Sequence, residues 1–201
     1  MAIVRSRQPP ATGPGLVGKA LRDLSGHPDR AAALGMAGGA ALNLSQPLPV
    51  FRLGLEDIVD EHCLDKAVEV GWRYLIEPAA GGGAGYADVR QAQGGGFKFA
   101  SLSKNANADR LLEAAHLAPQ VGTGSSVEYE ARILDVPAVY ISAIWLAAAT
   151  PVFIPYIDPA RLGQPGATVR VQADFLKDLV RLAADARSHL NNGPGRGGAA
   201  P

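Results

Sequence analysis

Aromatic and guanidinium side chains gather on segments of the chain that are expected to form neighbouring β-strands. Aromatic rings offer apolar contact area and guanidinium groups offer hydrogen-bond donors, and pockets for small molecules combine these two properties. If the strands are adjacent, these side chains predict a dispersed ligand pocket that needs no cofactor. The residues are Trp72, Arg73, Tyr74, Arg132, Tyr140 and Trp145.

A second group with possible chemistry is the acidic run from Glu56 to His62. Its oxygen and imidazole groups are metal ligands in principle. The run lacks the Glu-x-x-His and His-Glu-x-x-His spacings that place two ligands on one helix face. Acidic residues in the first turn of a helix are explained more simply by the helix dipole. No metal site is therefore predicted.

Cys63 is the single cysteine of the chain. One cysteine excludes an internal disulfide and a CxxC motif, and this usage fits a reducing cytosol. Consecutive residues of a helix point about 100° apart, so His62 and Cys63 do not form a catalytic dyad. Cys63 is predicted to be a buried structural residue.

The glycine runs at 81–85 and 94–96 are predicted to be flexible loops. Neither run is followed by the Gly-Lys-Ser/Thr of a phosphate-binding loop. The serines of the chain also lack the Gly-x-Ser-x-Gly elbow of a hydrolase nucleophile. The absence of these signatures favours a non-enzymatic protein over an enzyme.

Charge and targeting signals nominate no partner. Lysine and arginine number 19, aspartate and glutamate also number 19, and the formal net charge is +0. A chain without net charge has no overall field that attracts nucleic acid or an anionic membrane, so no nucleic-acid partner is predicted. Residues 1–10 contain no apolar run of signal-peptide length, and a cytoplasmic location is expected.

The elements that must position these side chains form one α+β domain over 47–190, with a mainly antiparallel sheet covered by helices. Its centre is a three-stranded meander over about 127–157. The segment 138–147 is apolar on both faces, so the middle strand of the meander needs cover on both sides. A closing helix over 173–190 supplies one cover. The other cover is unassigned: the Ala- and Gly-rich N-terminal helix, another subunit and a partner protein are the alternatives.

The rest of the chain divides at proline and glycine clusters. Composition predicts disordered tails over 1–15 and 191–201 and a helical, Ala- and Gly-rich segment over 16–46. Further helices are expected at 16–23, 30–44, 58–70 and beyond an Asn105 or Asn107 cap, and further strands at 50–58, 72–77, 86–90 and 97–102.

Glycines in the expected helix over 30–44 indicate a contact surface. Gly35, Gly38 and Gly39 each cost roughly 1 kcal/mol relative to alanine within a helix. A helix with so many glycines needs a neighbour that packs closely against its bare face. These three residues therefore predict an interaction surface for a protein partner or for self-association.

Three classes of function remain. The favoured one is a non-enzymatic protein–protein interaction or assembly module of a bacterial-type cytosolic protein. The second is a small-molecule-binding protein, or an enzyme, that uses the dispersed aromatic and arginine pocket. The third is a membrane-associated protein that uses the uncharged run 136–157, which is long enough to cross a bilayer as a helix. The prolines and β-branched residues of that run argue against a membrane span.

Overall fold

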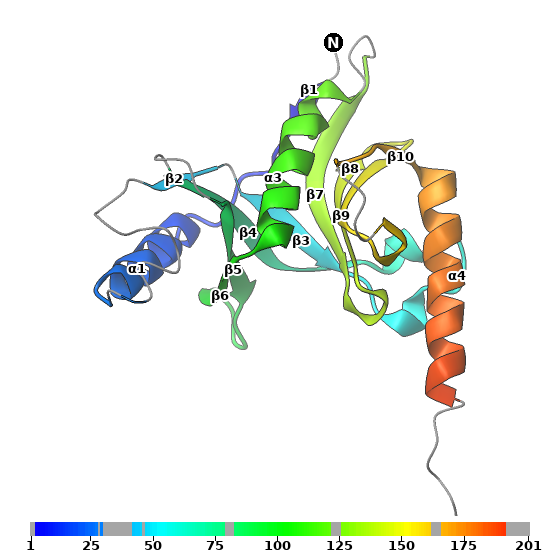
Figure 1. Ribbon diagram of the computed structural model, residues 1–201, viewed down its shortest axis with the longest axis horizontal. Coiled ribbons are helices and arrows are strands. Elements are labelled where there is room, and N and C mark those ends of the chain that lie inside the picture. Colours follow the sequence, from blue (N-terminus) through cyan, green and yellow to red (C-terminus); the bar gives the residue numbers. More distant parts are fainter. Residues whose placement is uncertain are drawn as a thin grey trace, which may run out of the picture.

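The computed structural model describes residues 3–27, 29, 42–45, 47–78, 83–121, 126–161 and 166–191. Within these ranges the chain forms three α-helices and a single ten-stranded sheet (Figure 1). The helices are α1 (Gly13–Ser25), α3 (Ala106–Leu117) and α4 (Gln172–Asn191). The strands are β1 (Ile3–Arg5), β2 (Leu42–Leu44), β3 (Leu48–Arg52), β4 (Val68–Pro78), β5 (Gly85–Gln91), β6 (Phe97–Lys104), β7 (Glu128–Val136), β8 (Ile141–Ala147), β9 (Val152–Ile157) and β10 (Arg170–Val171).

The sheet is mostly antiparallel. Its strands follow the order β10-β9-β8-β7-β3-β4-β5-β6, while β1 adds to β7 and β2 adds to β4. The parallel pairings are β1 with β7 and β3 with β7. Strands β7, β8 and β9 are consecutive antiparallel neighbours. The predicted α+β class and the predicted meander over 127–157 are therefore confirmed.

The two faces of the sheet are covered by different helices. Because successive strand residues point to opposite faces, Ile133 joins the apolar cluster that includes α3, while Leu134 joins the cluster that includes α4. Helix α1 packs on the same face as α4, against Trp72 and Ile76 of β4. In Figure 1, α3 crosses the front of the sheet, and α1 and α4 stand at its opposite ends.

Strand β8, the middle of the meander, is covered on both faces as its sequence requires. Ala143 and Trp145 pack in the cluster that includes α4. Ile144 and Leu146 pack in the cluster that includes α3. Helix α4 is the predicted closing helix, and the previously unassigned cover is α3 of the same chain. The second face of β8 is thus covered from within the chain.

The uncharged run 136–157 folds as β8, β9 and their turns. Pro155 lies in β9 beyond Val152 and Phe153, the two residues that pair with β10. Among the described strands, none pairs with the edge of β9 beside Pro155. No helix in the described part of the chain is both long and apolar enough to span a membrane.

The N-terminal segment is more regular than its composition suggests. Within the predicted tail 1–15, strand β1 pairs with β7, and α1 begins at Gly13. Pro14 favours this helix start, because an N–H in the first turn has no helical partner. The glycine- and proline-rich segment at the N-terminus therefore includes the first residues of α1. Residues 192–201, nearly all of the predicted C-terminal tail, lie outside the described residues.

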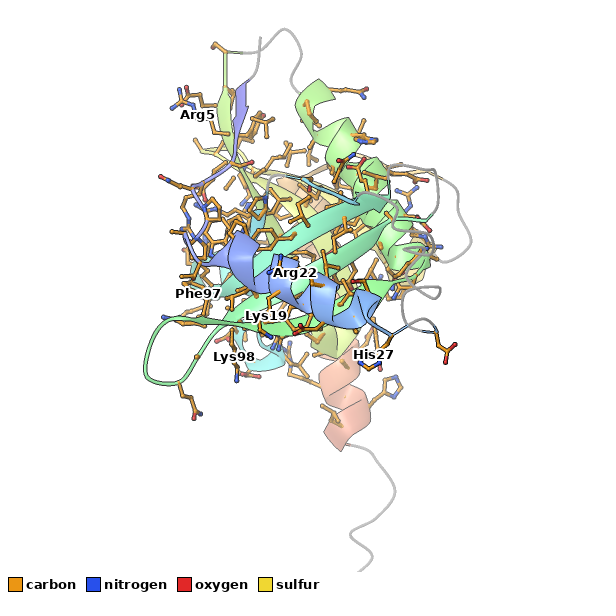
Figure 2. All side chains as sticks on the ribbon, turned by 90° about the vertical axis from the view of Figure 1, so that its left-hand side faces the viewer. Arg5, Lys19, Arg22, His27, Phe97 and Lys98 are labelled. Carbon is orange, nitrogen blue, oxygen red and sulfur yellow. The ribbon has the colours of Figure 1, made fainter. Side chains whose placement is uncertain are left out.

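Helix α1 is amphipathic. Val17 and Leu21 are buried against the sheet. Lys19 and Arg22 lie on the outer side of the helix (Figure 2). The outer side also carries an ion pair of 2.7 Å between Lys19 and Asp23, one turn apart. The position of α1 is thus fixed by its apolar side.

The predicted helix over 58–70 is wrong. Residues Leu55–Asp57 and Cys63–Lys66 form single 3-10 turns, and β4 begins at Val68. Arg187 of α4 donates hydrogen bonds to the carbonyl groups of Leu55 and Ile58. A distant side chain thus satisfies the Ile58 carbonyl, which a helix over 58–70 would have paired locally. Tertiary contacts have overridden a local periodicity.

The predicted helix over 30–44 is partly contradicted. Residues Leu42–Leu44 form β2, which pairs antiparallel with β4. This pairing requires extended backbone, so the helix cannot continue to residue 44. The remainder of the prediction lies outside the described residues.

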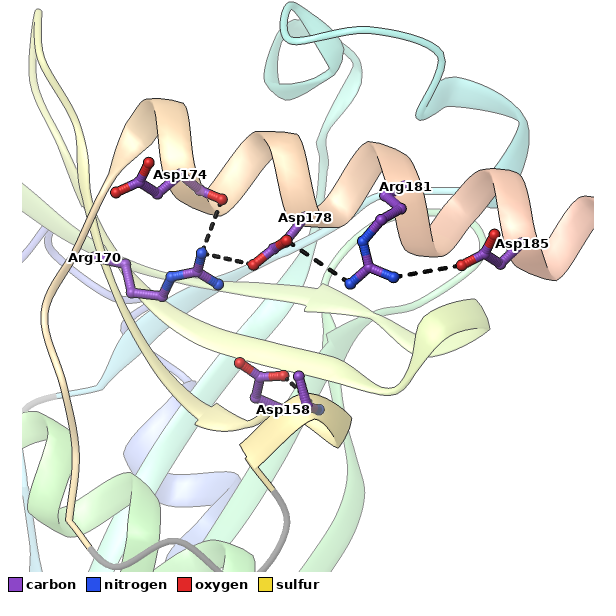
Figure 3. Close-up of polar contacts among 7 residues, drawn as sticks. Asp158, Arg170, Asp174, Asp178, Arg181 and Asp185 are labelled. Atoms are coloured by element: carbon purple, nitrogen blue, oxygen red, sulfur yellow. Dashed lines mark hydrogen bonds and ion pairs between the residues drawn. The ribbon is translucent and has the colours of Figure 1, made fainter.

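Helix α4 is anchored by a buried side and by a row of ion pairs. Phe175, Leu176 and Leu179 are fully buried, and the Phe175 ring stacks on Phe153 with centroids 4.1 Å apart. On the outer side, an arginine next to the helix start and one within the helix alternate with aspartates (Figure 3). Such exposed pairs contribute at most about 1 kcal/mol each, so the buried side dominates. The row consists of Arg170, Asp178, Arg181 and Asp185.

Candidate ligand-binding cavity

The sheet forks where the long strands β4 and β7 separate. At one end β3 lies between them and pairs with both, with Val50 opposite Gly71 on β4 and Ile133 on β7. At the other end β4 pairs with β2 and β7 pairs with β1. Among the described strands, β1 and β2 do not pair with each other. The sheet therefore has a fork between β1 and β2.

A cavity of about 550 Å³ lies at this fork, between the sheet and α3. Its volume falls within the range of small-molecule sites, roughly 300–1,000 Å³. The inner wall is aliphatic and is contributed by α3 and by strands on both sides of the fork. Its buried members are Leu75, Leu111, Ala118, Ala131, Ile133 and Ile144.

Polar side chains of the lining lie at the mouth of the cavity, beside apolar ones such as Leu112. Ser6 follows β1, Ser45 follows β2, and both are half-buried. Glu77 of β4 is also half-buried, and His116 in the last turn of α3 is exposed. A mostly apolar lining with a few polar groups is expected of a ligand pocket.

Arg73 is the charged residue of the inner wall and is only 6% exposed. Its Nε donates to Asp88 Oδ1 at 2.7 Å, and its Nη2 donates to Oδ2 at 2.9 Å. Nη1 donates to the Tyr156 hydroxyl at 2.7 Å, and Nη2 lies 3.8 Å from Asp135 Oδ2. The guanidinium carbon Cζ is 4.2 Å from the centroid of the Tyr86 ring. We call these five residues the Arg73 cluster.

The Arg73 cluster combines one guanidinium with two carboxylates. Burial opposes the charged form of Arg73, but Tyr156, Asp88 and Asp135 outweigh burial and hold the pKa of Arg73 above its ordinary value. Burial also raises the pKa of Tyr156, so this phenol is neutral at physiological pH. The cluster therefore places two aspartates beside a single arginine, so its acidic side chains outnumber its basic one.

Of the six residues predicted to form a dispersed pocket, Arg73 lines this cavity. Trp72 and Tyr74, its neighbours in β4, point to the opposite face and pack against α1. Arg132 and Trp145 also lie on that opposite face. Strand alternation places side chains of consecutive residues on different faces. The six residues therefore do not converge on one pocket.

Tyr140 lies apart from the other five residues. It is 76% exposed in the turn before β8. Its φ of 55° is in the left-handed region, which is uncommon for a residue with a side chain. The Tyr140 ring thus projects from a tight turn and reaches neither face of the sheet core.

Arg132 and Trp145 line an open hollow of about 500 Å³ on the face shared by α1 and α4. The Arg132 Cζ lies 4.8 Å from the centroid of Phe51 and 4.9 Å from that of Trp145. Glu130 accepts two hydrogen bonds from Arg132, at 2.9 and 3.2 Å, which lower the pKa of Glu130. The guanidinium and both rings are thus engaged with one another, which makes this hollow the weaker candidate.

Two residues at the cavity mouth, Glu77 and His116, were not singled out from sequence. Neither belongs to a motif, and they line the same cavity from different elements, Glu77 from β4 and His116 from the last turn of α3. One signal was available: Leu111, Leu112 and Ala115 give α3 a wider apolar stripe than one packing contact needs. Leu112 and Ala115 are only half-buried and line the cavity.

The other sequence candidates give no second site. Gly35, Gly38 and Gly39 lie outside the described residues. Within the described ranges, no three His, Cys, Asp or Glu side chains are close enough together to hold a metal ion. Cys63 is buried, as predicted, and burial raises the pKa of its thiol to about 11.

Comparisons with known proteins leave the cavity as the main guide to function. No protein-family model matches the chain, and no curated protein or solved structure is significantly similar to it.

Proposed function

We propose that the protein binds a small, largely apolar molecule in the cavity between α3 and the fork of the sheet. The observation that carries this proposal is the cavity itself, about 550 Å³ with a buried aliphatic wall and a few polar groups at its mouth. Its volume and its mostly apolar lining are those of small-molecule sites.

The lining also supports binding rather than catalysis. Acid–base chemistry needs a titratable group positioned at the reacting atoms. The titratable lining residues Glu77 and His116 lie at the mouth, where solvent reaches them. The inner wall offers aliphatic groups and Arg73, whose guanidinium is held by Asp88 and Tyr156. A binding protein therefore accounts for the lining more simply than an enzyme does.

Binding of the neutral, environment-sensitive dye Nile red tests the proposal. We expect the fluorescence of the dye to rise on binding, and the Ala115→Phe variant to abolish the rise because its ring would fill the cavity beside Leu112. The matched control is Ala106→Phe, the same change at an exposed position of α3 that does not line the cavity. Equal dye binding by wild type and both variants would refute the proposal.

The interaction-module hypothesis remains a second prediction. Its main support was the glycine-rich surface at Gly35, Gly38 and Gly39, which lies outside the described residues. Analytical ultracentrifugation of the full chain tests self-association directly, with the triple alanine variant of these glycines as the comparison. A monomer at all concentrations would contradict self-association.

A further inference from the structure

The charge of the Arg73 cluster restricts the chemistry of the ligand. Building on the proposed function, we infer that the ligand is uncharged and presents a carbonyl or hydroxyl oxygen to Arg73. The rest of the molecule is aliphatic, because the walls around Arg73 are formed by side chains such as Leu75, Ile133 and Ile144.

Arg73 has donor capacity left for such an oxygen. A guanidinium group has five N–H donors. Three of them make the hydrogen bonds to Asp88 and Tyr156. The remaining donors belong to Nη1 and Nη2, and Arg73 is the member of its cluster that lines the cavity. An acceptor on the ligand would complete the hydrogen bonding of the guanidinium.

A carboxylate is a poor partner for Arg73 despite the opposite charge. Asp88 already binds the guanidinium through two hydrogen bonds, and Asp135 lies 3.8 Å from Nη2. A ligand carboxylate would add a third negative charge beside a single buried positive charge. Like charges in a buried site strongly disfavour the ionised form. The cluster therefore rejects an anion.

A cation is also a poor partner. An ammonium group entering the cavity would meet Arg73 before it could reach Asp88 or Asp135, which do not line the cavity. Beside Arg73 two positively charged donor groups would then face each other, because the Glu77 carboxylate lies at the mouth. A ligand in reversed orientation, with its tail at depth, would place methylene groups against the unused N–H donors of Arg73, which is costly in a buried site.

Displacement of Nile red by decyl compounds with different head groups tests the inference. Decanol and decanamide are the uncharged probes, while decanoate and decylammonium are the charged probes, all at neutral pH. We expect the uncharged compounds to bind at least about tenfold more tightly than either ion, which corresponds to about 1.4 kcal/mol. Decanoate or decylammonium binding as tightly as decanol would overturn the inference and leave the proposed function intact.

An Asp135→Asn variant separates the charge from the shape of the site. Asparagine retains an acceptor for Ser142, which donates to Asp135 in the wild type. The cluster would become neutral, so we expect the preference for decanol over decanoate to fall about tenfold. Asp65→Asn, an exposed carboxylate that lines the hollow on the opposite face, is the control and should leave the preference unchanged.

The outcomes for the two proposals are distinguishable. An unchanged preference in Asp135→Asn, with decanol still bound, would overturn the role of the cluster charge. Failure of Nile red and all four decyl compounds to bind the wild type would refute the proposed function, and the head-group inference with it.

Discussion

The Asp88→Ala variant tests the energetics of the Arg73 cluster. Asp88 accepts hydrogen bonds of 2.7 and 2.9 Å from Arg73, and the two side chains are 8% and 6% exposed. Removing one partner leaves a buried guanidinium without its main counter-charge, a change that typically costs 3–5 kcal/mol, so we expect about that loss. Part of the loss would be offset by Asp135, which stays 3.8 Å from Nη2.

The matched control is Glu130→Ala, because Glu130 and Arg132 form the same two-point interaction in a more open setting. Their hydrogen bonds are 2.9 and 3.2 Å, but the side chains are 31% and 25% exposed. Solvent screens such a pair, and we expect its loss to cost about 1 kcal/mol or less. The two pairs differ little in hydrogen-bond geometry, so the expected difference in cost between Asp88→Ala and Glu130→Ala comes from burial.

Urea unfolding followed by circular dichroism measures both variants. With a denaturant slope of about 1–3 kcal/mol per molar for proteins of ordinary size, Asp88→Ala should lower the midpoint by about 1 M or more. The double variant Arg73→Met, Asp88→Leu should recover most of the loss, because apolar groups of similar volume need no counter-charge. An Asp88→Ala midpoint no lower than that of Glu130→Ala would refute the reasoning.

Three further predictions concern other parts of the fold. Gly71→Ala should destabilise the fold by about 2 kcal/mol or more, because the new Cβ would lie 2.1 Å from a carbonyl oxygen of β5. The control Gly18→Ala in α1 should be neutral or stabilising in the same urea assay, because its Cβ would meet only the end of an arginine side chain at 3.6 Å. Cys63 should react slowly with a thiol reagent at neutral pH until urea is added, and fast labelling of the native protein would contradict its burial. The folded state should also lose stability as pH rises from 9.0 to about 11, because in this range only the thiol of the unfolded state ionises. Asn105→Ala should cost about 1 kcal/mol by thermal unfolding, because the Asn105 side chain accepts from two N–H groups of α3, and Asn107→Ala, which keeps this cap, should cost less.

Local periodicity predicts much of this fold. The alternation around Tyr129 and the apolar spacing of the closing helix identify β7 and α4, and the cap at Asn105 identifies α3. These signals depend on neighbouring residues, so they survive in a single sequence. Periodicity also predicts which face of an element is buried.

Long-range pairing is the part that periodicity does not contain. The parallel contacts of β3 with β7, and hence the fork, depend on residues far apart in the chain. For the same reason, the sequence grouped Arg73 with Arg132 although their strands present them to opposite faces. The helix predicted over 58–70 is wrong for a different reason: Arg187, distant in sequence, binds the Ile58 carbonyl, which local rules assign to a helix.

The parallel pairing of β1 with β7 has a consequence for the order in which the chain can fold during synthesis. β1 is made first, yet its partner strand emerges more than half the chain later. The second edge of β3 likewise stays unpaired until β7 has been made. The long chain segments between these strands make pairing slow, because closing a long loop costs conformational entropy. The antiparallel strands β4, β5 and β6 are contiguous and can assemble early. The cavity is therefore among the last features that the nascent chain completes, and a ligand could bind there only after β8 has been made.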